Sequence, residues 1–169
     1  NYKEILSDTI FLKAMVNDLT IIFWKEILIT VLALLFALAV TRFKLKKPEV
    51  AFIRFLFYIP DILSIIVIST VWLFIFNPNV GLLNGVLQAL HLDFLIPVNG
   101  WLTGGTLMPS IIFIAVWSGI GYFMIVLIAA INDVPKELYE SAEIDGAGQW
   151  RQLIYVTIPN IWSQIRFVM

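Results

Sequence analysis

The most concentrated group of reactive side chains in this sequence is a set of carboxylates within residues 132–159. A single lysine stands among the acidic residues of this stretch: Asp133, Glu137, Glu140, Glu143 and Asp145, with Lys136. Exposed carboxylates accept strong hydrogen bonds from the lysines and arginines of a protein partner, whereas an anionic membrane surface repels them. The stretch therefore predicts either a docking element for another protein or an ordinary solvated helix, and spacing alone does not separate the two.

The same stretch contains start and stop signals for short helices. Asp133 and Pro135 are typical of a helix start, and Gly146 is typical of a stop or a sharp turn. Between these signals Tyr139 and Ala142 share one side of the predicted helix, while the charged residues lie on the other. We expect one amphipathic helix, a turn at Gly146 and a second short helix after it.

Other kinds of chemistry lack the residues they need. The 169 residues contain no cysteine and one histidine, His91, so the sequence offers no thiolate metal site, thiol catalysis or histidine-based hydrolysis. The phosphate-binding pattern GxxxxGK[ST] is absent, and Gly104-Gly105-Thr106 lacks its lysine. A net charge of −1 does not indicate the basic surface that binding of nucleic acid requires. We expect no catalytic residues, no metal site and no cofactor bound by this chain.

The composition predicts an all-α polytopic transmembrane protein. Sixty per cent of the residues are hydrophobic and 14% are charged, and the mean hydropathy is +0.93, a balance that a soluble domain of this size cannot hide from water. A helix needs about 20 apolar residues to cross a membrane. The segments that qualify are about 19–41, 55–76 and 107–131, with a further span starting at about 154–169. Pro60 and Asp61 interrupt the second of these segments. Because the sequence begins without methionine and ends within a span, we expect a helical bundle incomplete at both ends.

The distribution of basic residues predicts the orientation of these spans. Lysines and arginines are concentrated within residues 42–54, whereas residues 77–105 contain neither. The positive-inside rule then makes 77–106 an extracytoplasmic loop and 132–157 a cytoplasmic one. Helical spacing of apolar residues within 80–95 indicates a short interfacial helix in the outer loop. Trp72 and Trp101 fit the aromatic belt of a membrane interface, with stacking on a ligand as the alternative.

The second predicted span suggests part of a path for a solute. Asp61, Ser64 and Trp72 lie within about 80° of one another if the span is one helix with 3.6 residues per turn. A carboxylate inside a membrane is costly unless it faces protein or water, so Asp61 is a candidate functional residue. The alternative is that Asp61 lies near the cytoplasmic boundary and caps the helix after Pro60.

The third predicted span offers aromatic and small residues on one side. Trp117 lies on the face that would complete the path, with Tyr122 beside it. The small residues Ser118, Gly119 and Gly121 fit plain helix packing as well as contact with a solute.

The loop at 132–159 resembles the EAA loop of the membrane subunits of binding-protein-dependent ABC importers, the MetI-like permeases. The matching residues are Glu140-Ser141-Ala142, Asp145-Gly146-Ala147 and Ile158-Pro159, with Ser141 where the family has its first alanine. The segment from Trp72 to Asn84, together with Gly121-Tyr122-Phe123, is similar to the carbohydrate-uptake branch and its first permease subunit. The resemblance covers nearly the whole chain.

This resemblance implies a function, partners and site residues. The chain would move a sugar, oligosaccharide or polyol through a bacterial or archaeal cytoplasmic (inner) membrane, as a multi-pass subunit surrounded by lipid. Its partners would be a second permease in a heterodimer, two cytoplasmic ATPases that bind ATP and magnesium, and an extracytoplasmic binding protein. The implied ATPase-coupling residues are Glu137, Glu140, Ser141, Ala142, Asp145, Gly146 and Ala147.

Alternative functions remain open at this point. The same importer type could serve another class of solute. An ion-coupled secondary transporter would explain Asp61 but would leave the acidic cytoplasmic loop unexplained. A membrane-embedded enzyme would need clustered acids, histidines or a nucleophile at one depth, and the spans offer one isolated aspartate.

Overall fold

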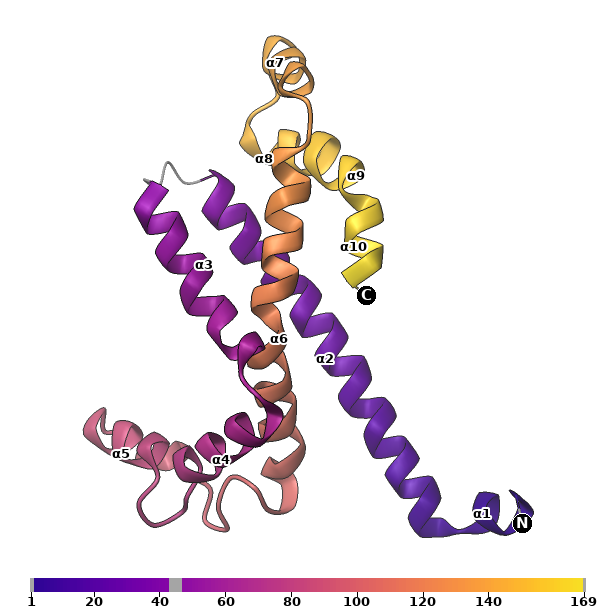
Figure 1. Cartoon of the computed structure of the whole chain (residues 1–169), viewed down its shortest axis with the longest axis vertical. Helices are drawn as coiled ribbons and strands as arrows, with labels where there is room; N and C mark the ends of the chain where they lie inside the picture. Colours follow the sequence, from indigo (N-terminus) through magenta and orange to yellow (C-terminus); the bar gives the residue numbers. More distant parts are fainter. Residues whose placement is uncertain (1, 43–46, 169) are drawn as a thin grey trace. The chain divides into compact units, whose positions relative to one another are not determined.

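Helices form all the regular secondary structure in the part of the chain that the computed structural model describes, residues 2–42 and 47–168 (Figure 1). The α-helices are α1 (Tyr2–Ser7), α2 (Thr9–Arg42), α3 (Lys47–Ile62), α4 (Ile65–Ile75), α5 (Leu82–Ala89), α6 (Leu107–Asn132), α7 (Lys136–Ile144), α8 (Gln149–Gln152), α9 (Ile158–Asn160) and α10 (Trp162–Val168). Short 3₁₀-helices cover Asp93–Leu95 and Gly104–Thr106, and a π-helix covers Leu153–Thr157. The predicted orientation also uses residues 43–46, and the fourth predicted span ends at Met169; these five residues lie outside the described ones.

The chain divides into two compact units. One unit is Asn1–Lys25 with Leu63–Ser118, and the other is Glu26–Ile62 with Gly119–Met169. The long helices α2 and α6 each contribute to both units. We call the first the loop unit, because it contains the predicted outer loop, and the second the coupling unit, because it contains the predicted cytoplasmic loop.

Two of the described helices are long and apolar enough to cross a membrane, α2 and α6. Helix α6 begins at Leu107, as predicted, because an uncharged run leaves nothing to interrupt it. Helix α2 begins at Thr9, well before the predicted residue 19. The Asp8 carboxylate accepts the Ile10 N–H at 2.8 Å, so a side-chain cap, which hydropathy does not register, sets the start of α2.

The predicted span over residues 55–76 is broken in the structure, close to the interruption that Pro60 and Asp61 indicated. The chain forms α3 and α4 instead, and they reach the length of a span only when taken together. Pro60, in the last turn of α3, has no N–H and crowds the preceding turn. Ser64 is then extended, with φ −60° and ψ 142°, and its hydroxyl oxygen accepts the Ile66 N–H to start α4. Asp61 therefore lies in the last turn of α3, and Ser64 rather than Asp61 caps the helix that follows.

Close helix packing in the coupling unit depends on two glycines of α6. A Cβ atom on Gly121 would lie 2.0 Å from the Phe57 carbonyl oxygen of α3, which is far inside van der Waals contact. A Cβ atom on Gly119 would lie 3.2 Å from Ile29 Cδ1 of α2, the flexible end of a side chain. Both glycines thus serve helix packing, which was one of the two interpretations of these small residues.

The core of the loop unit is the buried face of α4. Ile68, Trp72 and Phe76 recur at helical spacing and are all buried. Trp72 is only 8% exposed, so the prediction that it belongs to an interfacial aromatic belt is wrong. The belt pattern arose because a tryptophan near the end of a span also fits an interface, and tertiary packing decides between the two positions.

The predicted interfacial helix 80–95 is shorter in the structure. Helix α5 ends at Ala89, and His91 follows with a φ of 57°, a left-handed conformation that stops the helix. Buried Asn84 fixes the loop, because its Nδ2 donates to the Pro78 carbonyl at 3.0 Å and its Oδ1 accepts the Trp101 Nε1–H at 2.8 Å. One amide side chain therefore connects both ends of the predicted outer loop.

We expect Asn84→Leu to lower the free energy of unfolding by about 2–3 kcal/mol, because it removes both bonds and leaves polar partners unsatisfied. The matched control is Gln88→Leu, one turn later on α5 at an exposed position, with an expected change within about 0.5 kcal/mol. Unfolding of the purified subunit in detergent measures both variants. Equal losses for the two variants would contradict the role given to Asn84.

Candidate functional site

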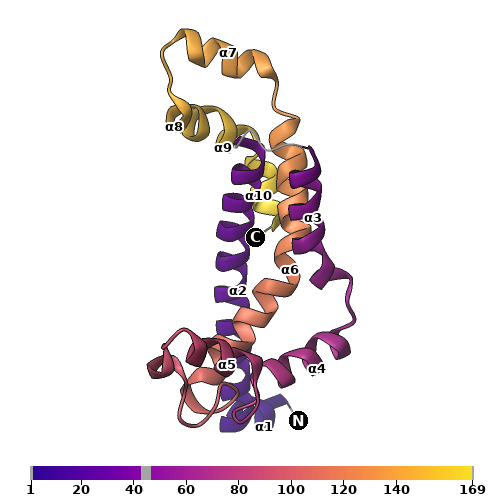
Figure 2. The same cartoon turned by 90° about the vertical axis from the view of Figure 1, so that its left-hand side faces the viewer.

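The predicted coupling residues form a helix–turn–helix element in the coupling unit. Helix α7 is followed by a turn and the short helix α8, which leads directly into the π-helix (Figure 2). Pro135, rather than Asp133, occupies the position before α7, and the buried Val134 anchors the chain there. The amphipathic helix and the second short helix that the sequence predicts are both present.

The turn between α7 and α8 depends on Gly146. Its φ is +75°, which is the left-handed conformation that glycine adopts without strain. The Ala147 N–H donates to the Ala142 carbonyl at 2.8 Å and the Gly146 N–H to the Glu143 carbonyl at 3.0 Å, so the last turn of α7 is satisfied by its own loop. No atom lies within 4 Å of the position of a Cβ on Gly146, so backbone conformation alone accounts for the glycine.

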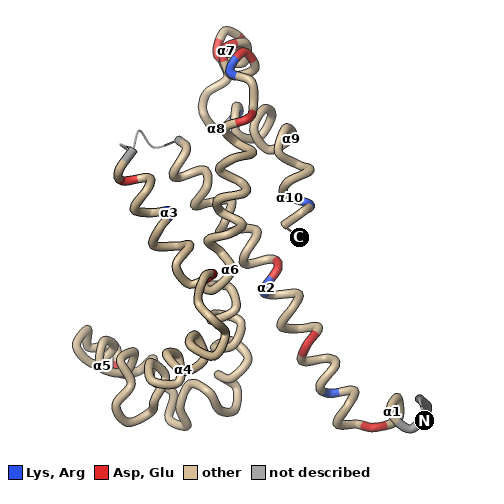
Figure 3. Tube along the Cα trace, in the orientation of Figure 1, with Lys and Arg blue, Asp and Glu red and all other residues tan. Residues whose placement is uncertain are grey.

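The acidic residues of α7 form an exposed stripe. Acidic positions are found along α7 (Figure 3). Glu137, Glu140 and Glu143 recur every three residues there and are all exposed. Side chains three apart are neighbours on a helix surface. The Ser141 hydroxyl donates to the Glu137 carbonyl at 2.7 Å, so this serine turns its oxygen back onto the helix and presents little more than a methylene group. That geometry explains why serine can stand where the family has alanine.

The remaining predicted coupling residues differ in how exposed they are. Asp145 and Gly146 are exposed, whereas Ala142 and Ala147 are half-buried against their own element. The sequence analysis did not single out two large exposed apolar side chains of this element, Ile144 at 87% exposed and Trp150 at 78% exposed. Exposed apolar side chains next to charges are typical of docking surfaces. The sequence could have indicated this for Ile144, because helical spacing places Ile144 away from the apolar side of α7 that contains Tyr139 and Ala142.

Among the predicted path residues, the structure brings Trp72 and Trp117 together in the loop unit. Their rings are 5.3 Å apart between centroids in an edge-to-face arrangement, and Phe113 meets Trp72 in the same way at 5.4 Å. Phe76 in turn stacks on Trp101 at 5.9 Å. We call these five side chains the aromatic cluster. The sequence contains a pattern that could have indicated this cluster. Aromatic residues stand four apart in two places, at 72 and 76 and at 113 and 117, so each pair lies on one side of a helix.

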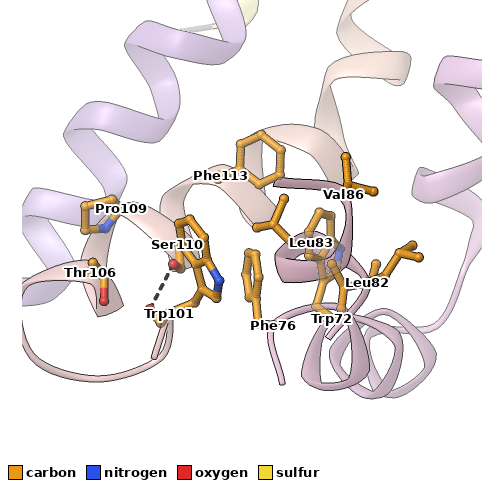
Figure 4. A pocket seen from close by; sticks show the side chains of 11 residues that line it. Trp72, Phe76, Leu82, Leu83, Val86, Trp101, Thr106, Pro109, Ser110 and Phe113 are labelled. Carbon is orange, nitrogen blue, oxygen red and sulfur yellow. Dashed lines mark hydrogen bonds between the residues drawn. The ribbon is translucent and has the colours of Figure 1, made fainter. Parts of the chain in front are cut away.

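A pocket of about 540 Å³ opens beside the aromatic cluster (Figure 4). Its walls are almost entirely apolar. The Ser110 hydroxyl among them donates a hydrogen bond to the Trp101 carbonyl at 3.0 Å. The lining residues are Trp72, Ile75, Phe76, Leu82, Leu83, Val86, Trp101, Thr106, Pro109, Ser110 and Phe113. Such walls suit the apolar face of a molecule better than its hydroxyl groups.

The other predicted path residues lie apart from this cluster in the chain. Ser64 is the exposed cap of α4, while Asp61 and Tyr122 belong to the coupling unit. The single stripe of Asp61, Ser64 and Trp72 does not exist, because the break at residues 63–64 separates Asp61 from the helix that contains Trp72. That these residues line a path stays a prediction.

Comparison with known proteins decides the family. Residues 29–168 match the family described as "Binding-protein-dependent transport system inner membrane component". The chain belongs to this family. This permease family is the one that the EAA-like loop indicated, so that prediction is confirmed, as is the all-α transmembrane fold.

Individual relatives of this permease are named for carbohydrate uptake. The chain is 36% identical over 173 residues to the "Diacetylchitobiose uptake system permease protein NgcF" of Streptomyces coelicolor, covering 98% of the chain and 49% of that protein. It is 32% identical over 170 residues to the "Arabinooligosaccharides transport system permease protein AraP" of Halalkalibacterium halodurans, covering 99% and 52%. The chain thus spans about half the length of the curated relatives it matches.

Solved structures show the same permease fold. The chain is similar to one in the "Crystal structure of bacterial alginate ABC transporter in complex with alginate pentasaccharide-bound periplasmic protein", with a TM-score of 0.82 and 25% identity. The match covers 97% of this chain and 56% of the other. With the family match and the apolar helices, it establishes this permease as a membrane protein.

Proposed function

We propose that this permease chain is the membrane-spanning part of an ABC importer subunit for a sugar, oligosaccharide or polyol in a bacterial or archaeal cytoplasmic membrane. The main support is the family match over residues 29–168, together with relatives whose names specify diacetylchitobiose uptake and arabinooligosaccharide transport. The same proposal includes a second permease subunit, two cytoplasmic ATPases that hold ATP and magnesium, and an extracytoplasmic binding protein. ATP hydrolysis takes place in the ATPases and not in this chain.

In this proposal α7 and α8 are the docking element for an ATPase. The carboxylates of Glu137, Glu140 and Glu143 accept charged hydrogen bonds from basic side chains of the ATPase. Ile144 and Trp150, both exposed, supply apolar contact area on the same element. When ATP binding draws the ATPases together, the docked element moves with them and shifts the helices to which it is joined.

Solute transfer then involves the aromatic residues of the spans. We propose that Trp72, Trp117 and Tyr122 line part of the path, with Asp61 and Ser64 near it. We expect Trp117→Ala to reduce solute uptake by about tenfold or more, because the loss of a large aromatic surface costs at least 1.4 kcal/mol of binding. The matched control is Trp162→Ala on α10, an exposed tryptophan with no proposed path contact. Uptake that Trp117→Ala leaves unchanged would show the path to be wrong.

Reconstitution tests the proposed function directly. The full-length subunit, its second permease and its ATPase are placed in proteoliposomes with the binding protein outside, and labelled diacetylchitobiose, arabinotriose and glycerol 3-phosphate are offered in turn. We expect accumulation of a carbohydrate that requires both internal ATP and the binding protein. Accumulation driven by a proton or sodium gradient without ATP would contradict the proposal and favour a secondary transporter. Uptake of glycerol 3-phosphate alone would keep the importer but change its solute class.

A further inference from the structure

One side-chain hydrogen bond joins α7 to the start of the segment that follows the docking element. The Tyr139 hydroxyl and Thr157 Oγ1 are 3.0 Å apart, and the two residues are 18 positions apart in the sequence. Thr157 is fully buried, with an exposed fraction of 0%, and Tyr139 is half-buried. Ser141 and the stripe of glutamates on α7 are exposed, so Tyr139 is the polar side chain of α7 that turns inward.

The bond is part of a longer chain of contacts within the coupling unit. Thr157 Oγ1 donates to the Gln152 carbonyl at 3.4 Å, and Gln152 Nε2 donates to the Ala147 carbonyl at 3.1 Å. The Ala147 N–H donates to the Ala142 carbonyl of α7 at 2.8 Å. The contacts therefore close a ring through α7, the turn, α8 and the π-helix, and a ring of this kind moves as one body more readily than separate helices do.

Thr157 occupies the point at which the helix changes type. It is the last residue of the π-helix Leu153–Thr157, and Ile158 and Pro159 begin α9 immediately after it. A π-helical turn is rare and is a place where a helix can be reset or bent, and Pro159 has no N–H to continue the regular ladder. The Thr157 carbonyl accepts the Ile161 N–H at 3.1 Å, so Thr157 is bonded to both sides of the junction.

We propose that Tyr139 and Thr157 are positioning residues that transmit movement of the docked α7 to α9 and α10. This inference rests on the proposed function, since it assumes that α7 docks on an ATPase. Glu140, Gly146 and their neighbours hold the ATPase, whereas the hydroxyl pair determines how much of the ATPase movement reaches the segment after Thr157. Without the pair, ATP is hydrolysed with the ATPase still bound, but less solute moves for each ATP.

The test separates docking from transmission. In the reconstituted full-length importer we compare ATPase copurification, ATP hydrolysis and solute uptake for Tyr139→Phe, Thr157→Val and Thr157→Ser. Tyr155→Phe is the matched control, because it removes a hydroxyl from a 75% exposed tyrosine on the same π-helix. We expect Tyr139→Phe and Thr157→Val to keep copurification within about twofold of native and to lower solute moved per ATP by about fivefold, the change that the net worth of one hydrogen bond supports. Thr157→Ser, which keeps the oxygen, should restore the native ratio.

The outcomes are distinguishable. An unchanged ratio of solute to ATP in Tyr139→Phe, or an equal fall in Tyr155→Phe, would overturn the inference while leaving the proposed function intact. A parallel loss of copurification and uptake in Tyr139→Phe would assign the pair to folding or docking and would also overturn it. Failure of the native chain to bind any ATPase would overturn the proposed function itself.

Discussion

Gly146→Val is expected to lower copurification of the ATPase with the full-length subunit by about tenfold or more, whereas Gly148→Val is expected to leave it near the native level. Gly146 has a φ of +75°, and a β-branched residue is strained there by about 1–3 kcal/mol. Gly148 has a φ of −66° and a ψ of 169°, an extended conformation that valine adopts readily. Neither position has an atom within 4 Å of a Cβ, so the two variants add equal volume to open space. The strained turn would redirect α8, and Trp150 with it, relative to α7.

Pull-down of the tagged subunit from membranes, with the bound ATPase quantified, measures this effect. We expect at least a tenfold loss for Gly146→Val, since redirecting half of the docking surface costs more than 1.4 kcal/mol of binding. Gly146→Asn is a second control, because asparagine tolerates the left-handed conformation better than other residues and should retain most of the binding. Equal binding by the two valine variants would contradict the view that the turn conformation positions the docking element.

Gly121→Ala is expected to lower the free energy of unfolding by about 3 kcal/mol, the upper end of the usual cost of overpacking. The new methyl group would lie 2.0 Å from the Phe57 carbonyl oxygen and 2.8 Å from Tyr58 Cα, both of them backbone atoms. Helix α3 would therefore have to move as a whole, because no side chain is available to give way. Gly119→Ala meets only the tip of the Ile29 side chain at 3.2 Å, and we expect a loss below about 1 kcal/mol.

Thermal unfolding of both variants in the same lipid nanodiscs checks this prediction, with amounts in the membrane as a second readout. Gly121→Ala should unfold at a clearly lower temperature than Gly119→Ala. If the two alanine variants were equally stable, α3 and α6 would not cross as closely at Gly121 as the structure has them.

Much of the helical fold could be predicted from the sequence, because apolar runs and terminator residues act locally. The uncharged run before Asn132 predicted α6 closely, and Pro135 and Gly146 bracketed α7. Pro60 and Asp61 indicated an interruption between α3 and α4, but the sequence did not predict a full break. Apolar residues continue through Ile62 and Leu63, and a proline inside a membrane helix often produces a kink only. The extended backbone at Ser64, whose hydroxyl caps α4, completes the break.

Some residues of the candidate site could likewise be predicted from the sequence, and others could not. The coupling residues were predicted because Glu140 and Gly146 stand at fixed spacing in a short stretch. The pairing of Trp72 with Trp117 brings two helices together, and sequence spacing alone could not separate it from an interfacial position. Thr157 was missed because a π-helix shifts the register of side chains by one residue, so the regular helical period gives no sign of its contact with Tyr139.

The most direct test of the central claim is whether an ATPase covers the end of α7. The 169 residues contain no cysteine, so Ile144→Cys places one reactive thiol at an 87% exposed position of this chain, and Phe94→Cys places one at a 79% exposed position of the predicted outer loop. Labelling by a membrane-permeant maleimide is followed in the full-length subunit, made free of other cysteines, with and without the ATPase. We predict that the ATPase slows labelling at residue 144 by about tenfold or more and leaves residue 94 unchanged. Equal labelling at residue 144 with the ATPase bound would contradict the assignment of α7 and α8 as the docking element.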